Sequence, residues 1–350
     1  MVPRYLLFSE PVIPDFMEIH CPSCGGRWKI ASDSAPGVCK CGETFIVDMP
    51  IIQSGLYCWT QAFRERGGVG EQYPTIERDY LEKYDIVHVN YTPGHPNYIE
   101  SIRNALGDKT SVKLVANVDY AMSMWETLNP FNMKRQLNMA DLVFHVESMG
   151  AHALSRFLGR YVPIIPHPVD TRHIKQMPRS SRDPHAKPLV TCQWHRYGGT
   201  WSSYYFGTLG LNCVKFLTSF TPPNPQKLVN LETLFERVIP AMPYEQYLQT
   251  VLSMATANMD LAPDITYGRG IVDAAAFGIP TVGSESVEAS RVIWPELTVP
   301  AFNHSAVHET TKKLLTDKEF YDKMATQGRD RSELYSCESS YYKMMEALYG

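Results

Sequence analysis

The feature that most constrains this sequence is an alternation of short β-rich runs with helix-like segments, repeated in two consecutive series. In the first series, strands are predicted at residues 5–8, 86–89, 112–118, 142–146 and 161–165, and helices at residues 56–66, 133–139 and 151–158. In the second series, strands are predicted at residues 189–192, 213–220 and 280–283, and helices at residues 243–258 and 271–277. Such alternation is typical of parallel sheets with right-handed crossovers. We therefore expect two α/β domains.

A stretch rich in Pro, Ser, Arg and His separates the two series at residues 167–188 and predicts the interdomain linker. We expect a first domain over residues 1–167, a second over 168–330, and a C-terminal helix over 331–350 that crosses back to the first. A chain of 350 residues suits two domains of ordinary size. Because parallel sheets bind ligands at the carboxyl ends of their strands, the shared cleft is the expected active site.

The composition is that of an ordinary globular protein, with 44% apolar and 20% charged residues. A formal net charge of −4 excludes a global positive field that would hold the chain on nucleic acid or an anionic membrane. No apolar run approaches the ~20 residues that cross a bilayer, and residues 1–10 do not resemble a signal peptide. We therefore expect a cytoplasmic protein.

Four of the eight cysteines lie within 21 residues, as Cys21-Pro22-Ser23-Cys24-Gly25 and Cys39-Lys40-Cys41-Gly42. Four thiolates complete a closed tetrahedral zinc site, which is structural and not catalytic. The pattern therefore predicts a zinc ribbon over about residues 18–48, with Cys21, Cys24, Cys39 and Cys41 as ligands. Because the second pair is CxC, His20 is an alternative ligand, and four free cysteines in a loop are the plain alternative. The other cysteines stand in apolar surroundings.

Several segments occur in the order and spacing of a known family. In the second half these are residues 242–248 (MPYEQYL), 258–264 (NMDLAPD) and 268–284 (GRGIVDAAAFGIPTVGS). In the first half they are residues 84–89 (YDIVHV), 140–148 (ADLVFHVES) and 164–171 (IIPHPVDT). Together they resemble the large, mostly retaining family of GT-B glycosyltransferases typified by sucrose and glycogen synthases. The resemblance implies two Rossmann-like domains facing a cleft, with acceptor in the first and nucleotide-sugar donor in the second. The zinc ribbon is then an insertion in the first domain.

The resemblance is incomplete in three respects. The family's usual glycine loop after the first strand is obscured by the cysteine-rich insertion. Family members usually carry two acidic residues eight apart, and Asp273 fits the second position while Ile265 occupies the first, next to Asp264. Of the family's basic pair, an Arg followed five residues later by a Lys, only Arg196 is present.

The donor-binding residues that the resemblance implies are Asp264, Tyr267, Gly268, Arg269, Gly270 and Asp273. Asp273, in the first turns of a helix, can accept hydrogen bonds from two ribose hydroxyls. Gly268 and Gly270 allow close approach of the backbone to phosphate at a helix N-terminus, and Arg269 can offer a bidentate charge to the diphosphate. The alternatives are that Asp273 is an exposed helix residue and that residues 268–270 form a plain strand-to-helix turn with a solvated Arg269.

Three further residues are candidates for the chemistry: Asp119, His95 and Arg196. An inverting enzyme needs a general base for the acceptor hydroxyl, which Asp119 or His95 can supply; a retaining enzyme needs none. Arg196 can stabilise the leaving diphosphate, or it forms an interdomain salt bridge. The structural alternatives are that Asp119 caps a turn and that His95 is a surface loop residue. His88, within a predicted strand, is expected to be a hydrogen-bonded core histidine.

The leading hypothesis is a glycosyltransferase that moves a hexose from a nucleotide sugar, UDP-sugars favoured, to an unidentified acceptor hydroxyl without a catalytic metal. A second hypothesis is a DNA glycosyltransferase acting on hydroxymethylated bases, with the zinc ribbon contacting nucleic acid. A third is a degenerate, non-catalytic sugar-nucleotide-binding or scaffold protein, suggested by the departures at Ile265 and at the missing lysine.

Overall fold

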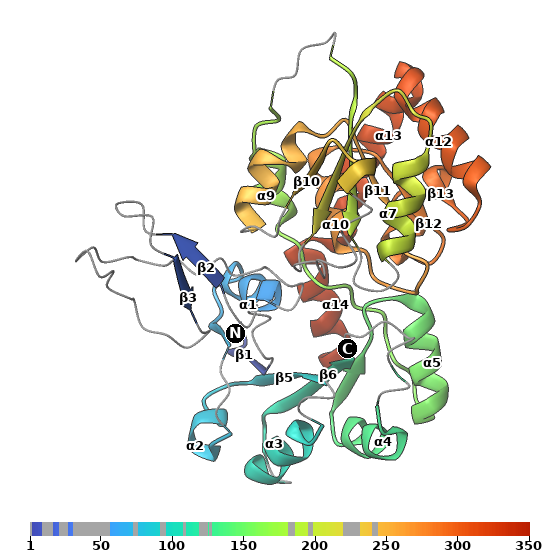
Figure 1. The fold of residues 1–350 in the computed structure, drawn as a ribbon. Helices are drawn as coiled ribbons and strands as arrows, with labels where there is room; N and C mark the ends of the chain where they lie inside the picture. Colours follow the sequence, from blue (N-terminus) through green and yellow to red (C-terminus); the bar gives the residue numbers. More distant parts are fainter. Residues whose placement is uncertain are drawn as a thin grey trace.

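A computed structural model of the chain contains two parallel α/β domains, one above the other (Figure 1). The residues it describes are 2–8, 17–20, 27–30, 57–72, 76–91, 96–107, 110–118, 125, 128–180, 186–194, 199–219, 232–239 and 244–350.

The first domain is built on five parallel strands in the order β4-β1-β5-β6-β7. The strands are β1 Tyr5–Phe8, β4 Gly70–Gln72, β5 Ile86–Tyr91, β6 Lys113–Val118 and β7 Leu142–Phe144. The helices are α1 Tyr57–Arg64, α2 Arg78–Leu81, α3 Tyr98–Leu106, α4 Pro130–Asn138 and α5 Ser148–Leu158. The chain runs from β1 to β4 on one side and from β5 to β6 on the other. The strand order therefore reverses between β1 and β5, which is where doubly wound sheets bind ligands.

Both faces of this sheet are covered. One face packs Leu6 and Val87 against α2, α3, α4 and α5, and the other packs Tyr5 and Ile86 against α1 and the last helix, α14 Cys337–Tyr349. Since side chains alternate between the faces of a strand, a strand buried on both faces must be apolar nearly throughout, as β1 (YLLF) is.

The second domain has six parallel strands in the order β10-β9-β8-β11-β12-β13. The strands are β8 Leu189–Trp194, β9 Val214–Ser219, β10 Arg237–Ile239, β11 Ala257–Asp260, β12 Thr281–Ser284 and β13 Thr298–Val299. The helices are α6 Thr171–Gln176, α7 Gly199–Thr208, α9 Tyr244–Thr250, α10 Arg269–Phe277, α11 Glu288–Ile293, α12 His304–Thr316 and α13 Lys318–Arg331. The strand order reverses between β8 and β11, as in a dinucleotide-binding fold.

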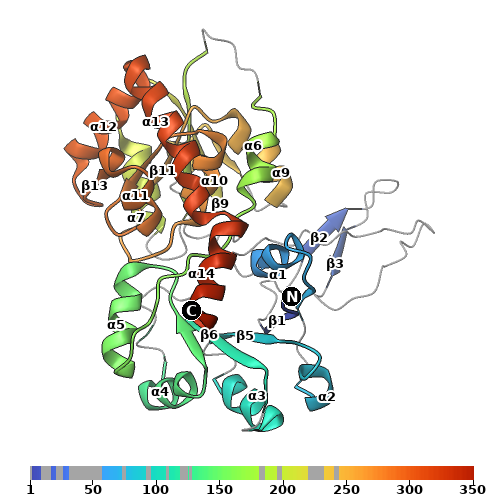
Figure 2. The ribbon, with the colours of Figure 1, turned by 180° about the vertical axis from the view of Figure 1, so that it is seen from behind.

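Helix α14 leaves the second domain and packs on the first, which Figure 2 shows from behind. Glu338 forms an ion pair with Arg66 at 2.6 Å, and the ring of Tyr341 meets that of Phe63 at 5.0 Å. The start of the helix stays attached to the second domain's side through a bridge between Ser336 and Val169. One helix therefore contacts both domains.

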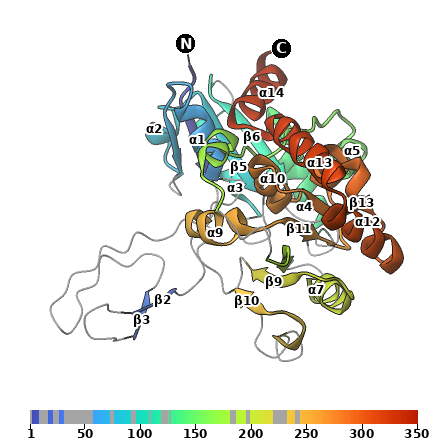
Figure 3. The same cartoon turned by 90° about the horizontal axis from the view of Figure 1, so that it is seen from above.

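A separate antiparallel hairpin, β2 Met17–His20 and β3 Arg27–Ile30, projects away from both domains (Figures 1 and 3). Its connection, residues 21–26, contains the first cysteine pair of the predicted zinc ribbon. All four predicted ligands lie outside the described residues, so the zinc site stays a prediction.

Three sequence-based predictions of secondary structure were wrong. The helix predicted over 243–258 ends at Thr250, and Ala257–Asp260 is the central strand β11. The predicted strand over 161–165 is only a bridge from Ile164 to His145. The predicted linker contains α6, whose first turn is capped by Asp170 accepting from the His173 amide at 2.9 Å. A buried helix followed by a buried strand gives one continuous apolar run, which explains the first error.

Candidate active site at the domain interface

The loop from β11 to α10 lies at the carboxyl edge of the second sheet, beside the reversal of strand order. It ends at Gly268, whose φ of +86° is left-handed and whose Cβ, if present, would lie 2.2 Å from Val287 Cγ1. Only glycine fits both conditions. Gly268 is the N-cap of α10, and a helix N-terminus favours anionic groups.

Arg269 and Asp273 form an ion pair one turn apart on α10. Arg269 Nε lies 2.8 Å from Asp273 Oδ1, and the Tyr244 hydroxyl of α9 donates to the same oxygen at 2.7 Å. Arg269 also donates to the Tyr244 hydroxyl oxygen at 2.8 Å. Asp273 is completely buried, and its Oδ2 has no hydrogen-bond partner among the described residues. The two side chains predicted to bind the donor are therefore bonded to each other, and one carboxylate oxygen remains unsatisfied.

The same arginine reaches the first domain. Its Nη1 lies 3.7 Å from the sulfur of Cys58 on α1. Burial raises the pKa of the Cys58 thiol, although the nearby Arg269 opposes that shift. The thiol is therefore neutral near pH 7, and Arg269 contacts it as a weak acceptor and not as a counter-ion.

A second contact between the domains runs through His167. Trp59 Nε1 on α1 donates to His167 Nδ1 at 3.1 Å, and the Tyr267 hydroxyl donates to the His167 carbonyl at 2.8 Å. All three residues are buried. Tyr267, predicted as a donor-binding residue, thus fastens the β11–α10 loop to the segment that joins the domains.

Asp264 lies in the same loop and is partly buried. Its Oδ1 accepts from the following amide, of Ile265, at 2.8 Å. A pocket of about 500 Å³ lies beside it at the carboxyl ends of β11, β12 and β13, lined by Pro263, Glu285, Ser286 and residues 300–304. Phe302 in this lining is 70% exposed. The structure brings Asp264, Tyr267, Gly268, Arg269, Gly270 and Asp273 together on one loop and helix start.

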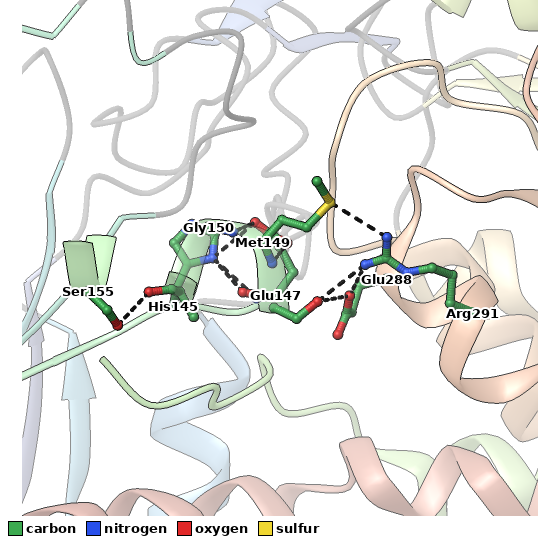
Figure 4. A network of polar contacts seen from close by, with 9 residues as sticks. His145, Glu147, Met149, Gly150, Ser155, Glu288 and Arg291 are labelled. Atoms are coloured by element: carbon green, nitrogen blue, oxygen red, sulfur yellow. Dashed lines mark hydrogen bonds and ion pairs between the residues drawn. The ribbon is translucent and has the colours of Figure 1, made fainter. Parts of the chain in front are cut away.

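A polar network joins the carboxyl end of β7 to that of β12 (Figure 4). Glu147, buried, caps α5 by accepting from the amides of Met149 at 2.7 Å and Gly150 at 2.6 Å. Burial raises the pKa of Glu147. The next residue, Ser148, donates to Glu288 of the second domain at 2.8 Å, and Arg291 donates to both Ser148 and Glu288. The helices that follow the carboxyl ends of β7 and β12, α5 and α11, therefore contact each other across the domain interface.

His88 is buried within β5 and hydrogen-bonded at both ring nitrogens, to Tyr5 at 2.5 Å and to Asn117 at 2.7 Å. The prediction of a satisfied core histidine is confirmed. Burial lowers the pKa of His88 to about 3, so the ring is neutral at pH 7.

The three residues predicted to act in the chemistry, Asp119, His95 and Arg196, lie outside the described residues. Their neighbours are described: Asp119 directly follows β6, and Arg196 follows β8 by two residues. His95 lies in the connection after β5. All three thus follow the carboxyl ends of strands, and the strands before His95 and Arg196, β5 and β8, flank the two reversals of strand order. Their roles stay predictions.

Sequence reasoning missed Tyr244, Cys58, Trp59 and His167. The sequence places Tyr244 in the predicted helix 243–258 and in the family segment 242–248, with no role of its own. It places Cys58 in apolar surroundings, which its burial confirms. A tyrosine on an otherwise apolar face does carry a signal, because its buried hydroxyl needs a partner. The partner itself, 29 residues away, has no local signal.

Solved structures similar in shape include an α,α-trehalose 6-phosphate synthase from Burkholderia multivorans, with a TM-score of 0.61, 12% identity, and coverage of 77% of this chain and 74% of that one. They also include sucrose-phosphate synthase from Thermosynechococcus elongatus, with a TM-score of 0.59, 18% identity, and coverage of 98% and 86%. A third, trehalose-6-phosphate from E. coli bound with UDP-2-fluoro glucose, has a TM-score of 0.60, 10% identity, and coverage of 78% and 76%. The chain has a GT-B fold. No family model and no curated protein matches its sequence.

Two further observations concern the described ranges alone. None of their helices is both long and apolar enough to cross a membrane. No group of three or more His, Cys, Asp or Glu side chains is placed there to hold a metal ion.

Proposed function

We propose that this protein is a glycosyltransferase that transfers a hexose from a nucleotide-sugar donor, with a UDP-sugar favoured, to an acceptor hydroxyl. The observation that carries the proposal is the start of α10. A left-handed glycine, helix amides and a buried Arg–Asp pair stand at the carboxyl edge of the second sheet, in a GT-B fold. Three solved proteins of this shape are named as sugar-phosphate synthases or hold a UDP-sugar analogue.

In this proposal the donor diphosphate lies against the amides of residues 268–270, where the helix dipole stabilises its charge. The partly exposed guanidinium of Arg269, at 16%, adds positive charge. A ribose hydroxyl would donate to Asp273 Oδ2. Because Asp273 is completely buried, this contact requires Tyr244 or Arg269 to shift when the donor binds.

The first domain would supply the acceptor side. Asp119 or His95 would accept the acceptor proton if the reaction inverts, and would position the acceptor if it retains configuration. Arg196 would stabilise the departing diphosphate. No catalytic metal is part of this proposal.

Cys21, Cys24, Cys39 and Cys41 would bind one structural zinc on the hairpin β2–β3. Four thiolates leave zinc no open position for substrate. We therefore assign the module to acceptor recognition and not to chemistry.

The test is a thermal-shift screen with UDP-, GDP- and ADP-glucose, followed by measurement of nucleoside diphosphate release. We expect one nucleotide series to stabilise the protein and its sugar to be hydrolysed slowly or transferred. Stabilisation without any release would favour the non-catalytic hypothesis. Transfer only to hydroxymethylated DNA, with salt-dependent retention on DNA, would favour the DNA-modifying hypothesis. No stabilisation by any of the three donors would refute the proposal.

A further inference from the structure

Two asparagines stand side by side near the carboxyl edge of the first sheet. Asn90 of β5 and Asn117 of β6 are register partners, each one residue before its strand ends. Partners in adjacent parallel strands lie about 4.8 Å apart and point to the same face. This face is the one that packs on α1, since it also carries His88 and Tyr5.

In the structure, Asn117 Oδ1 lies 2.7 Å from His88 Nε2, and the Tyr5 hydroxyl lies 2.5 Å from His88 Nδ1. With this orientation of the amide, His88 Nε2 donates to Asn117 and the Tyr5 hydroxyl donates to His88 Nδ1. This relay of three buried side chains holds Asn117 Oδ1 toward His88. The Nδ2 group is consequently directed elsewhere.

The two amides leave one donor and one acceptor unsatisfied. Asn117 Nδ2 and Asn90 Oδ1 are both buried and have no hydrogen-bond partner within the part of the chain that the structure describes. Asn117 is 0% exposed and Asn90 is 8% exposed. Leaving a buried polar group unpaired costs about 1–3 kcal/mol, so an unpaired donor and an unpaired acceptor on neighbouring residues favour a bound group that satisfies both.

A hydroxyl group fits this pair chemically. It donates one hydrogen bond, to Asn90 Oδ1, and accepts another, from Asn117 Nδ2. A phosphate or carboxylate oxygen cannot donate to Asn90 Oδ1, and an ammonium cannot accept from Asn117 Nδ2. On the same face of the sheet, the buried ring of His88 meets those of Phe144 at 5.2 Å and Trp59 at 5.8 Å.

We propose that Asn90 and Asn117 bind one hydroxyl of the acceptor, and that this part of the acceptor is an uncharged, hydroxyl-rich molecule such as a sugar. The inference rests on the proposed glycosyltransferase function. It assigns the acceptor contact to strands β5 and β6, which lie across the domain interface from α10.

The test compares wild type with Asn90→Leu, which removes the unpaired oxygen at nearly constant volume, and with Asn138→Leu, an exposed control at the end of α4. The probes are D-glucose, D-fructose and maltose, with glucose 6-phosphate and fructose 6-phosphate as charged counterparts. Binding is measured by titration calorimetry, and transfer is measured with whichever nucleotide sugar the donor screen identifies.

We expect wild type and Asn138→Leu to bind a neutral sugar equally. Asn90→Leu should weaken that binding, or raise the acceptor KM, roughly tenfold, while the melting temperature measured without sugar does not fall. A fall in melting temperature with unaltered sugar binding would show that the amides hold a structural water, and would overturn the proposal. Binding of phosphorylated sugars alone, or of no sugar at all, would overturn it as well.

These outcomes are separable from a failure of the proposed function. If wild type neither binds nor hydrolyses a donor, the proposed donor site at α10 in the second domain is refuted. The sugar titrations need no donor and concern β5 and β6.

Discussion

The buried pair of Arg269 and Asp273 gives the sharpest prediction for stability. Replacing Arg269 by Met keeps much of the side-chain volume but removes the charge opposite Asp273, which is 0% exposed. The carboxylate would retain only the Tyr244 hydroxyl as a donor among the described residues. Breaking a buried ion pair from one side costs about 3–5 kcal/mol. Because Arg269 is itself 16% exposed, we expect the lower end, about 3 kcal/mol.

The assay is urea unfolding of wild type, Arg269→Met, Asp273→Asn and the double variant, measured on the transition of the second domain. Asp273→Asn removes the charge that needs a partner, so the double variant should be less destabilised than the sum of the single variants by about 2 kcal/mol. A cost below about 1 kcal/mol for Arg269→Met, with additive single effects, would show that the pair is not a buried ion pair in solution.

Three other predictions concern separate parts of the molecule. Gly268→Ala should destabilise the second domain by about 2–4 kcal/mol, because φ is +86° and the new Cβ would clash with Val287; wild-type unfolding curves would contradict the geometry of the β11–α10 turn. His88 has a folded pKa of about 3 against 6.5 unfolded, so the unfolded state takes up the proton first as pH falls. The contribution of His88 to the free energy of unfolding should therefore be full above pH 6.5 and decline by about 1.4 kcal/mol per pH unit below it. His88→Gln should reduce this slope, and an unchanged slope in that variant would show that His88 does not cause it. Metal analysis should find one zinc per chain, and a chelator that removes it should make the four cysteines between residues 21 and 41 reactive toward a thiol reagent. Freely titratable thiols in purified protein without zinc would refute the predicted zinc site.

The alternation of strands and helices made the two parallel α/β domains predictable from sequence, because each buried parallel strand is a short apolar run. The same signal failed at residues 243–258. Tyr247, Leu248, Val251 and Leu252 are all buried in the structure, but periodicity does not separate a buried helix from the buried strand that follows it. The helix α6 was missed because its six residues are too few to show a period.

The segment at the start of α10 could be located in the sequence by resemblance, but the environment of its side chains could not be predicted. The residues that flank an aspartate near the start of a helix do not show whether its carboxylate is exposed or buried. Asp273 is bonded by the hydroxyl of Tyr244, 29 residues earlier, and the guanidinium of Arg269 contacts the sulfur of Cys58, 211 residues earlier. The first contact follows from how two helices of the second domain pack and the second from how the two domains pack, and no local pattern encodes either.

The central claim, that a nucleotide sugar binds at the start of α10, is tested most directly by hydrogen–deuterium exchange with and without the donor found in the screen. We expect the donor to slow exchange in the peptide spanning residues 261–273. Protection confined to other segments, with residues 261–273 exchanging at an unchanged rate under saturating donor, would contradict it.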